Sequence, residues 1–363
     1  MADVVLPDWL VFRPRLFPSC NFVWLAGSRP VLVDSGFGSD LDATVGLLPG
    51  EPALVFNTHW HSDHVGGNAG LAERFGMPIA VSAGEGSRVN AGDPESFGSY
   101  YLDQPVDPYR VDQLVESGEL LETGAVSLRV VPAGGHSLGQ VALFEECSRV
   151  LIAGDAILAR DVAWINPFMD GAEALEAAIA TVERIGVLDA RVAVAGHGEV
   201  IEDVASCVKW SVERLKLWRQ DPARMAFHGC RRVFGFALMI HGGFARSEVL
   251  PYLLARRWVH DFAPLAGLAP EEFAERMISD LAGSGAARWV DDRLISTVPH
   301  TSGSRCRRLA SEIYSRRSAR RLQDRSRRRY PSSLAWPAVG RRSDDSGVGC
   351  RAPDQRPRQI PRR

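Results

Sequence analysis

Histidine and aspartate side chains stand at the ends of four separate short apolar runs, and this placement constrains the fold more than any other feature. The densest group is THWHSDH at 58–64, which follows the run ALVF and contains His59, His61, Asp63 and His64. On an extended stretch, residues two apart point to the same side, so His59, His61 and Asp63 can converge. Imidazole and carboxylate together are the usual ligands of zinc, and they also suit iron or manganese.

Three more donors follow later β-like runs, each directly after a glycine. His136 follows LRVVPAGG, Asp155 follows RVLIAG, and His197 follows RVAVAG. Glycine lets the backbone turn sharply and approach a metal closely, and the sites of α/β sheets gather at the carboxyl ends of strands. Seven donors at four strand ends suffice for two divalent metal ions. The other histidines lack such a setting and are interpreted as structural: His228, His241, His260 and His300.

The rest of the first 200 residues reads as strands with interspersed helices. NFVWLAG and RPVLVDSG predict two neighbouring strands with a turn at Gly27 and Ser28. AGLAERFG predicts a helix ending at Gly76, and GAEALEAAIATVERIG predicts an amphipathic helix ending at Gly186. Residues 84–118 predict a long excursion with at most one short helix. The alternation predicts a layered α/β sandwich.

From Glu202 onward the pattern is helical. DVASCVKWSVERLKLWRQ predicts one long helix ended by Asp221 and Pro222. Two more helices are predicted over SEVLPYLLARRWVHDF and PEEFAERMISDLAGSG, followed by a short pair of strands over ARWVDDRLIST. We therefore expect a catalytic domain at 1–200, a smaller helical module at 201–300 and a separate tail at 301–363.

Charge is divided unevenly along the chain. Residues 301–363 hold 18 Arg against 5 Asp and Glu, whereas the first 300 residues carry 24 basic and 39 acidic side chains. The tail is rich in Arg, Ser and Pro and cannot bury enough apolar surface to offset its ordering entropy, so we expect it to be disordered. Binding of RNA or of acidic partners and an out-of-frame origin both stay open for it.

Two compositional features bear on location. No run approaches the roughly 18 apolar residues that a membrane span needs, and the N-terminal stretch lacks the pattern of a signal peptide. We expect a cytoplasmic protein without a membrane partner. Six scattered cysteines, with no CxxC pair, are typical of reduced, buried thiols.

In their order along the chain, THWHSDH, GGH at 134–136, GD at 154–155 and GHG at 196–198 resemble the motifs of the metallo-β-lactamase-fold hydrolase superfamily. The resemblance covers roughly residues 10–200 and implies an αββα sandwich with the site along one sheet edge. VLVDSG resembles its first motif, whose aspartate, Asp34 here, supports the ligands from behind. The implied ligands are His59, His61 and His136 for one metal, Asp63, His64 and His197 for the second, and Asp155 as the bridge.

The resemblance also implies a mechanism. Two cations, expected to be zinc with iron or manganese as alternatives, share a hydroxide whose pKa falls to about 7. This nucleophile attacks a carbonyl or phosphoryl centre. Asp63 is expected to orient it and to pass a proton to the leaving group.

Within the superfamily the sequence looks most similar to the glyoxalase II group, so hydrolysis of a thioester of the hydroxyacylglutathione kind is the first expectation. Lactonases of this fold share all seven ligands and stay open. True β-lactamases of related motif lack the bridging aspartate, so such activity would be weak or promiscuous. A scaffold that has lost its metals is disfavoured because all seven donors are present.

The second module leaves one further alternative. Its helices and the following AARWVDDRLIS are similar to the small winged-helix appendage of some members, including an endoribonuclease-like group. A nuclease needs basic surface to hold phosphates, and the acidic body disfavours nucleic acid as a partner. The expected substrate is a small molecule, and its identity, the native metal and the oligomeric state are left open.

Aromatic residues of the excursion SFGSYYLDQPVDPYR are expected beside the metal edge. Tyr100, Tyr101 and Tyr109 are candidate oxyanion donors, with packing within the loop as the alternative. Trp60 is expected to face away from the metals, and Trp164 to line the substrate pocket.

Overall fold

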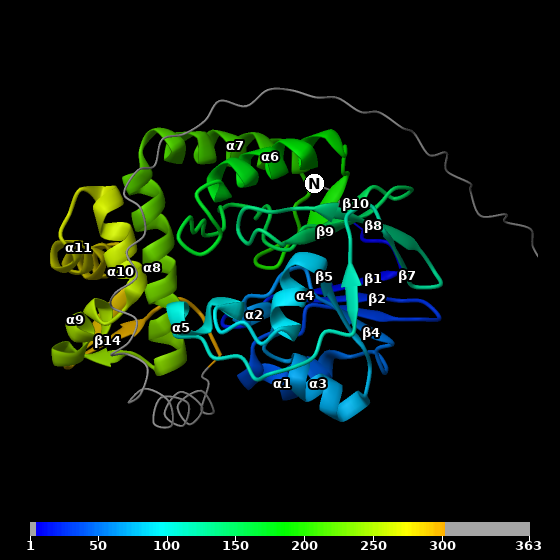
Figure 1. Cartoon of the computed structure of the whole chain (residues 1–363), viewed down its shortest axis with the longest axis horizontal. Helices are drawn as coiled ribbons and strands as arrows, with labels where there is room; N and C mark the ends of the chain where they lie inside the picture. The colour runs from blue at the N-terminus through cyan, green and yellow to red at the C-terminus, as the bar shows by residue number, and fades with distance from the viewer. Residues whose placement is uncertain (1–4, 302–363) are drawn as a thin grey trace, which may run out of the picture. The chain divides into compact units, whose positions relative to one another are not determined.

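The computed structural model describes residues 5–301, and its N-terminal part contains two sheets stacked face to face (Figure 1). The first sheet has six strands in the order β1-β2-β3-β4-β5-β6, antiparallel from β1 to β3 and parallel from β3 to β6. Its strands are β1 Leu10–Arg13, β2 Phe22–Leu25, β3 Val31–Val33, β4 Leu54–Phe56, β5 Ile79–Ser82 and β6 Gln113–Val115.

The second sheet has five strands in the order β11-β10-β9-β8-β7, all antiparallel except the parallel pair of β10 and β11. Its strands are β7 Leu120–Glu122, β8 Ser127–Pro132, β9 Val141–Glu145, β10 Val150–Ile152 and β11 Val192–Val194. Alternate residues of β9 face different cores. Leu143 packs between the two sheets, whereas Phe144 packs beneath the helices. Burial on both faces explains the nearly continuous apolar runs of these strands.

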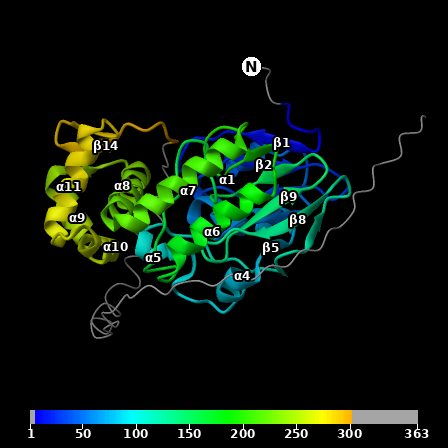
Figure 2. The same cartoon turned by 90° about the horizontal axis from the view of Figure 1, so that it is seen from above.

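Helices cover the outer face of each sheet, which gives four layers (Figures 1 and 2). The helices beside the first sheet are α1 Leu41–Leu47, α3 Asn68–Phe75 and α4 Ala83–Asn90, and those over the second are α6 Ala174–Val187 and α7 Val204–Gln220. Trp60 is buried in the core on the outer face of the first sheet, together with Trp24 and Val81, as predicted. The predicted αββα architecture is confirmed.

The C-terminal part adds more helices around a small antiparallel sheet of order β12-β14-β13. Its elements are α8 Pro222–His241, β12 Phe244–Ala245, α9 Arg246–Leu254, α10 Arg257–Phe262, η3 Ala263–Ala266, α11 Pro270–Gly283, β13 Ala287–Val290 and β14 Arg293–Ser296. They form most of a second core centred on Phe234, Trp258 and Phe273, to which Tyr101 and Trp164 of the N-terminal part also belong. The division of the chain near residues 200 and 300 stays a prediction. The tail, apart from Thr301, lies outside the described residues.

Several local predictions were wrong. Gly186 does not end its helix, because α6 continues to Val187 without a left-handed residue at its cap. Helix α7 does end at Gln220, directly before Asp221 and Pro222, as predicted, and Pro222 is the first residue of α8, where the missing N–H group costs no hydrogen bond. The segment SEVLPYLLARRWVHDF forms two helices, α9 and α10. Gly76, by contrast, adopts φ 68° at the end of α3, as predicted.

The excursion at 84–118 is also more ordered than expected. It contains most of α4, the short η2 Ser96–Gly98, α5 Ser99–Leu102 and the edge strand β6. Among residues 5–301, no helix is both long and apolar enough to cross a membrane.

Candidate metal centre

The histidine motif turns from extended chain into a helix halfway along. His59 follows β4, and His61 is the N-cap of the short helix α2 Ser62–Val65, which carries Asp63 and His64. The expectation of one extended stretch was therefore wrong. Asp63 reaches the cluster from a helical turn, and His64 enters it from the buried side of that turn with no side-chain exposure.

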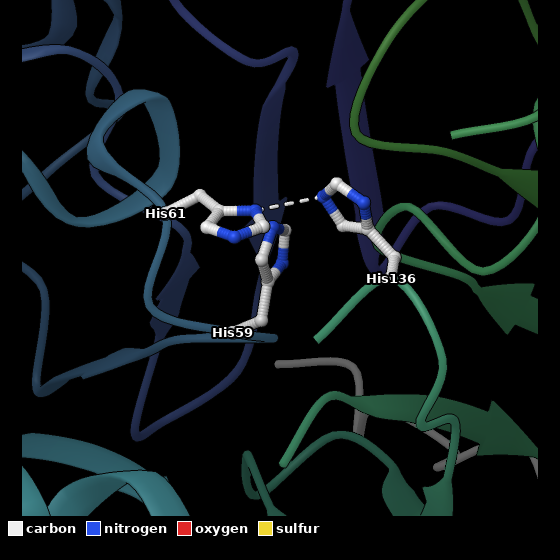
Figure 3. A group of neighbouring side chains, drawn as sticks. All are labelled: His59, His61 and His136. Carbon is white, nitrogen blue, oxygen red and sulfur yellow. Dashed lines mark hydrogen bonds between the residues drawn. The ribbon is translucent and has the colours of Figure 1, made fainter. Parts of the chain in front are cut away.

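The first group of donors consists of His59, His61 and His136, whose rings converge from two loops (Figure 3). Nδ1 of His61 lies 2.8 Å from Nε2 of His136. One nitrogen of each ring faces the others within 4.8 Å, a spacing that a single metal ion can bridge. This is the trio that the resemblance assigned to one metal.

The second group consists of Asp63, His64 and His197. Oδ2 of Asp63 lies 3.1 Å from Nε2 of His197 and 4.0 Å from Nε2 of His64. This trio corresponds to the second predicted set.

Asp155 lies between the two groups. Its Oδ1 is 3.6 Å from Nε2 of His64, and its Oδ2 is 3.6 Å from Nε2 of His136 and 3.7 Å from Nε2 of His197. The two oxygens of one carboxylate thus face donors of both groups. The structure brings all seven predicted residues together, and their binding of metal stays a prediction.

The chemistry of the donor atoms fits divalent cations. Nε2 of His59, Nε2 of His64 and Oδ1 of Asp155 are buried without a hydrogen-bond partner among the described residues. Such atoms are costly to bury unpaired, and a cation among them would compensate all three. Burial lowers the pKa of His59 and brings that of His61 to about 3, so both rings are neutral and offer lone pairs. Burial alone would raise the pKa of Asp155, but His197 and His64 outweigh it and keep the carboxyl ionised.

Hydrogen bonds behind the cluster orient the histidines. Asp34 accepts from the backbone N–H and the hydroxyl of Thr58, both at 2.8 Å, and its Oδ2 lies 2.7 Å from Nδ1 of His64. Nδ1 of His136 lies 2.6 Å from the carbonyl oxygen of Trp164. The supporting place expected for Asp34 agrees with this geometry.

Phe17 is a neighbour of the cluster that the sequence did not indicate. Its ring stacks on that of His197 with centroids 4.9 Å apart and an interplanar angle of 16°. The ring of Phe236, on α8, meets Phe17 edge-on at 6.3 Å. A helix more than 200 residues away in sequence therefore contributes to the wall of the site, and no local motif could reveal this.

A cavity of about 1410 Å³ opens from the cluster. Of the predicted donors, His61, Asp63, His136, Asp155 and His197 line it, so they are reachable by a substrate. Much of the remaining wall is apolar and includes Phe17, Leu102, Leu158, Trp164, Phe236 and Met239. The prediction that Trp164 lines the pocket is confirmed. Gln104 also lines it and accepts a hydrogen bond of 2.6 Å from the hydroxyl of Ser62.

The three tyrosines do not line this cavity. Tyr100 is 56% exposed, the hydroxyl of Tyr101 donates to Asp261 at 2.9 Å, and Tyr109 packs with its ring 5.5 Å from that of Phe97. Packing is thus the interpretation that the structure supports for Tyr101 and Tyr109, whereas Tyr100 is exposed. None of the histidines interpreted as structural belongs to a donor group among the described residues; His228, for example, faces the carbonyl oxygen of Val162 at 2.8 Å.

Comparisons with known proteins agree with this geometry. The profile of the metallo-beta-lactamase superfamily matches residues 13–197. A hydroxyacylglutathione hydrolase of Hyphomonas neptunium is 30% identical over 105 residues, which cover 29% of this chain and 34% of that protein. An atrochrysone carboxyl ACP thioesterase of Aspergillus fumigatus is 24% identical over 241 residues, covering 65% of this chain and 68% of that protein. The chain spans between 34% and 59% of the length of the first curated relatives it matches.

Among solved structures, a metallo-beta-lactamase family protein of Thermus thermophilus superposes with a TM-score of 0.51. The two chains are 24% identical, and the match covers 80% of this chain and all of the other, which indicates a shared fold. The superfamily profile covers more than half of the present chain and includes all seven donors of the cluster. The chain therefore belongs to the metallo-β-lactamase superfamily of metallo-hydrolases.

Proposed function

We propose that the protein is a dinuclear metal-dependent hydrolase of thioesters. The observation that carries the proposal is the cluster of seven donors at the wall of a large, mostly apolar cavity. Such a cavity suits an acyl group beside a reactive carbonyl. The names of two relatives, a hydroxyacylglutathione hydrolase and an ACP thioesterase, support a thioester as the bond that is cleaved.

The residues divide into three roles in this proposal. His59, His61 and His136 would hold one divalent ion, and Asp63, His64 and His197 the other, with Asp155 shared. Divalent ions in such a site polarise a carbonyl oxygen and lower the pKa of a water molecule to about 7. Zinc is the metal that this mixture of imidazole and carboxylate favours, with iron and manganese as alternatives.

Asp63 is the residue proposed to move the proton. Its side chain is 15% exposed and lines the cavity, while His59 and His64 lie behind it. A carboxylate in this position accepts a proton from the attacking water and delivers it to the leaving sulfur. His197, 3.1 Å away, keeps the carboxylate ionised, because His64 and His197 together lower the pKa of Asp63 against the effect of burial.

The test is a substrate screen with enzyme loaded with zinc or manganese. Thioesters, lactones, phosphodiesters and a β-lactam are offered at equal concentration, and the metal content is measured in parallel. We expect about two ions per chain and preferential turnover of thioesters. Turnover of phosphodiesters alone, or a metal-free active protein, would overturn the proposal.

A lactonase is the second candidate. It would use the same donors and the same apolar wall, since a lactone also presents an ester-like carbonyl. The screen separates the two, because a lactonase would favour a cyclic ester over an acyclic thioester with the same acyl chain.

A further inference from the structure

A second depression lies where α7, α8 and α11 meet, away from the donor cluster. Its volume is about 390 Å³, and its wall contains four arginines and two aspartates. These are Arg214, Arg224, Arg231 and Arg276, with Asp221 and Asp280. The first 300 residues are acidic as a whole, so a local excess of arginine here is unusual for this protein.

Only two of the arginines are neutralised. Arg224 pairs with Asp221 at 2.9 Å and Arg231 with Asp280 at 3.1 Å. Arg214 and Arg276 have no carboxylate partner among residues 5–301. Their guanidinium groups lie over aromatic rings instead, Arg214 at 5.8 Å from Trp210 and Arg276 at 4.7 Å from Phe227. The depression thus keeps two positive charges whose donors are available to an anion.

The start of α8 adds to this potential. Ala223 and Arg224, in the first turn of this 20-residue helix, line the depression. Pro222 has no N–H, and the N–H of Arg224 donates to the carbonyl oxygen of Asp221, so at this helix start the N–H of Ala223 is the group without a backbone partner among residues 5–301. Such an N–H favours an anion, and together with planar guanidinium groups it suits phosphate.

The depression adjoins the substrate cavity. Arg231 lines both. The distance between the depression and the donor cluster can be estimated along helix α8. Phe227 lies under Arg276 at the depression, and Phe236 contacts Phe17, which stacks on His197 of the cluster. Nine residues separate Phe227 from Phe236, which is about 14 Å of helix. An anion in the depression therefore lies far from the bond that is cleaved.

This separation discriminates between kinds of thiol. In glutathione the thiol branches from the middle residue, so each terminal carboxylate lies only one residue away from the residue that carries the thiol and cannot reach so far. Phosphopantetheine carries its thiol at one end of a long linear arm and its phosphate at the other. Trp210, 38% exposed and part of the cavity wall, offers an apolar surface along which such an arm can lie.

We propose that the substrate is a phosphopantetheinyl thioester whose phosphate binds between Arg214 and Arg276. The inference rests on the proposed thioester hydrolysis. One water molecule adds to the carbonyl carbon, the C–S bond breaks, and the thiolate takes up a proton, which yields a carboxylic acid and the free pantetheinyl thiol. Coenzyme A and a carrier protein both present this group.

The experiment compares four substrates with one acyl group: S-acylglutathione, acyl-pantetheine, acyl-coenzyme A and an acyl-carrier protein. Each is hydrolysed by the metal-loaded wild type and by the double variant Arg214→Gln/Arg276→Gln. The matched control is Arg184→Gln/Arg219→Gln, which removes the same charge from exposed residues outside both depressions. Binding of S-methyl phosphopantetheine, which cannot be hydrolysed, is measured by calorimetry as a readout independent of turnover.

We expect the double variant to raise KM for the phosphorylated substrates by about a hundredfold with kcat kept, about tenfold for each lost charge-assisted contact. Acyl-pantetheine, which lacks the phosphate, and the control variant should show no such change. Binding of S-methyl phosphopantetheine should weaken in parallel. Whichever of acyl-coenzyme A and acyl-carrier protein the wild type hydrolyses with the higher kcat/KM is the molecule that supplies the phosphopantetheinyl group.

The outcomes separate this inference from the proposed function. Efficient hydrolysis of S-acylglutathione, with phosphorylated substrates unaffected by the variant, would overturn the inference and leave thioester hydrolysis standing. If the double variant lost binding of S-methyl phosphopantetheine while the wild type hydrolysed no thioester, the anion site would be supported and the proposed function overturned. Tighter binding of a single-stranded RNA oligonucleotide than of phosphopantetheine, abolished by the same variant, would also overturn the inference.

Discussion

Nδ1 of His64 lies 2.7 Å from Oδ2 of Asp34, and the two side chains are almost completely buried. The same carboxylate accepts two hydrogen bonds from Thr58, the residue that precedes His59. Asp34 therefore fixes the ring of His64 and the start of the histidine motif at once. The opposite nitrogen, Nε2 of His64, is left facing Asp155 and Asp63.

The substitution Asp34→Asn should weaken the metal centre without unfolding the chain. Asp34 adopts φ 60°, a conformation that asparagine tolerates. The amide cannot serve as the charged acceptor for His64, and losses of roughly 10- to 100-fold in metal affinity are typical for such supporting residues. Competition with a chromophoric chelator measures the affinity. Wild-type affinity in a correctly folded variant would contradict the role assigned to Asp34.

Replacing Asp63 by alanine should abolish turnover and weaken one metal ion more than the other. The side chain belongs to the group with His64 and His197, whereas the trio of His59, His61 and His136 does not contain it. Metal content during stepwise dialysis against a chelator should show one ion leaving early. Asp42→Ala, at an exposed aspartate that pairs with Arg74, is the control. Near-normal activity of the Asp63 variant would refute the proposed proton transfer.

Removal of metal should lower the unfolding temperature. Without an ion, Nε2 of His59, Nε2 of His64 and Oδ1 of Asp155 lack partners among the described residues, and each unpaired buried group costs about 1–3 kcal/mol. Thermal unfolding followed by circular dichroism, with and without a chelator, checks this. Zinc or manganese should restore the transition, since an ion bound only by the native state stabilises it. An unchanged transition would show that the cluster holds no ion.

The seven donors could be predicted because they come after four strands, and these strands are visible in sequence as apolar runs, three of which stop at glycine. The residues that form the wall of the cavity could not be predicted from the sequence. Phe17 meets Phe236, and Tyr101 meets Asp261, across more than 150 residues of chain with no shared motif. Helix α8 was not predicted, although its apolar residues gather on one face, because its internal glycines, Gly229 and Gly235, and its phenylalanines have low helix propensity.

The variant Glu85→Gln should flatten the pH dependence of stability. Burial raises the pKa of Glu85 to about 8, while Ser137 donates a hydrogen bond to it. The folded chain therefore holds a proton that the unfolded chain releases above about pH 4.5, so stability falls as pH rises through about 8. Glutamine keeps the acceptor for Ser137 and carries no charge.

Urea unfolding of the metal-loaded protein between about pH 5 and pH 8.5 tests this, because titration of other groups cancels between variant and wild type. Each pKa unit corresponds to about 1.4 kcal/mol. Burial also raises the pKa of Asp170 to about 7, so the Glu85 variant should keep part of the dependence of the free energy of unfolding on pH. Glu73→Gln, at an exposed position of α3, is the control and should follow the wild type. Equal slopes in the Glu85 variant and the wild type would rule out a buried proton at this site.

Gly196→Ala should disrupt the centre by crowding alone. A β-carbon at this position would clash with Oδ1 of Asp155 and lie 2.6 Å from Cε1 of His64, two atoms of the donor cluster. Neither side chain can retreat, because His64 is held by Asp34 and Asp155 is enclosed by the cluster histidines. Overpacking of this kind costs about 1–3 kcal/mol, and the displaced donors should lower metal content and reduce kcat by at least about tenfold.

Gly84→Ala is the matched control, since Gly84 is exposed on α4 with nothing within 4 Å of an added β-carbon, so alanine there should be neutral or stabilising. If Gly196→Ala retained full metal content and wild-type kcat, the close approach of the backbone to Asp155 and His64 would not be a requirement of the site.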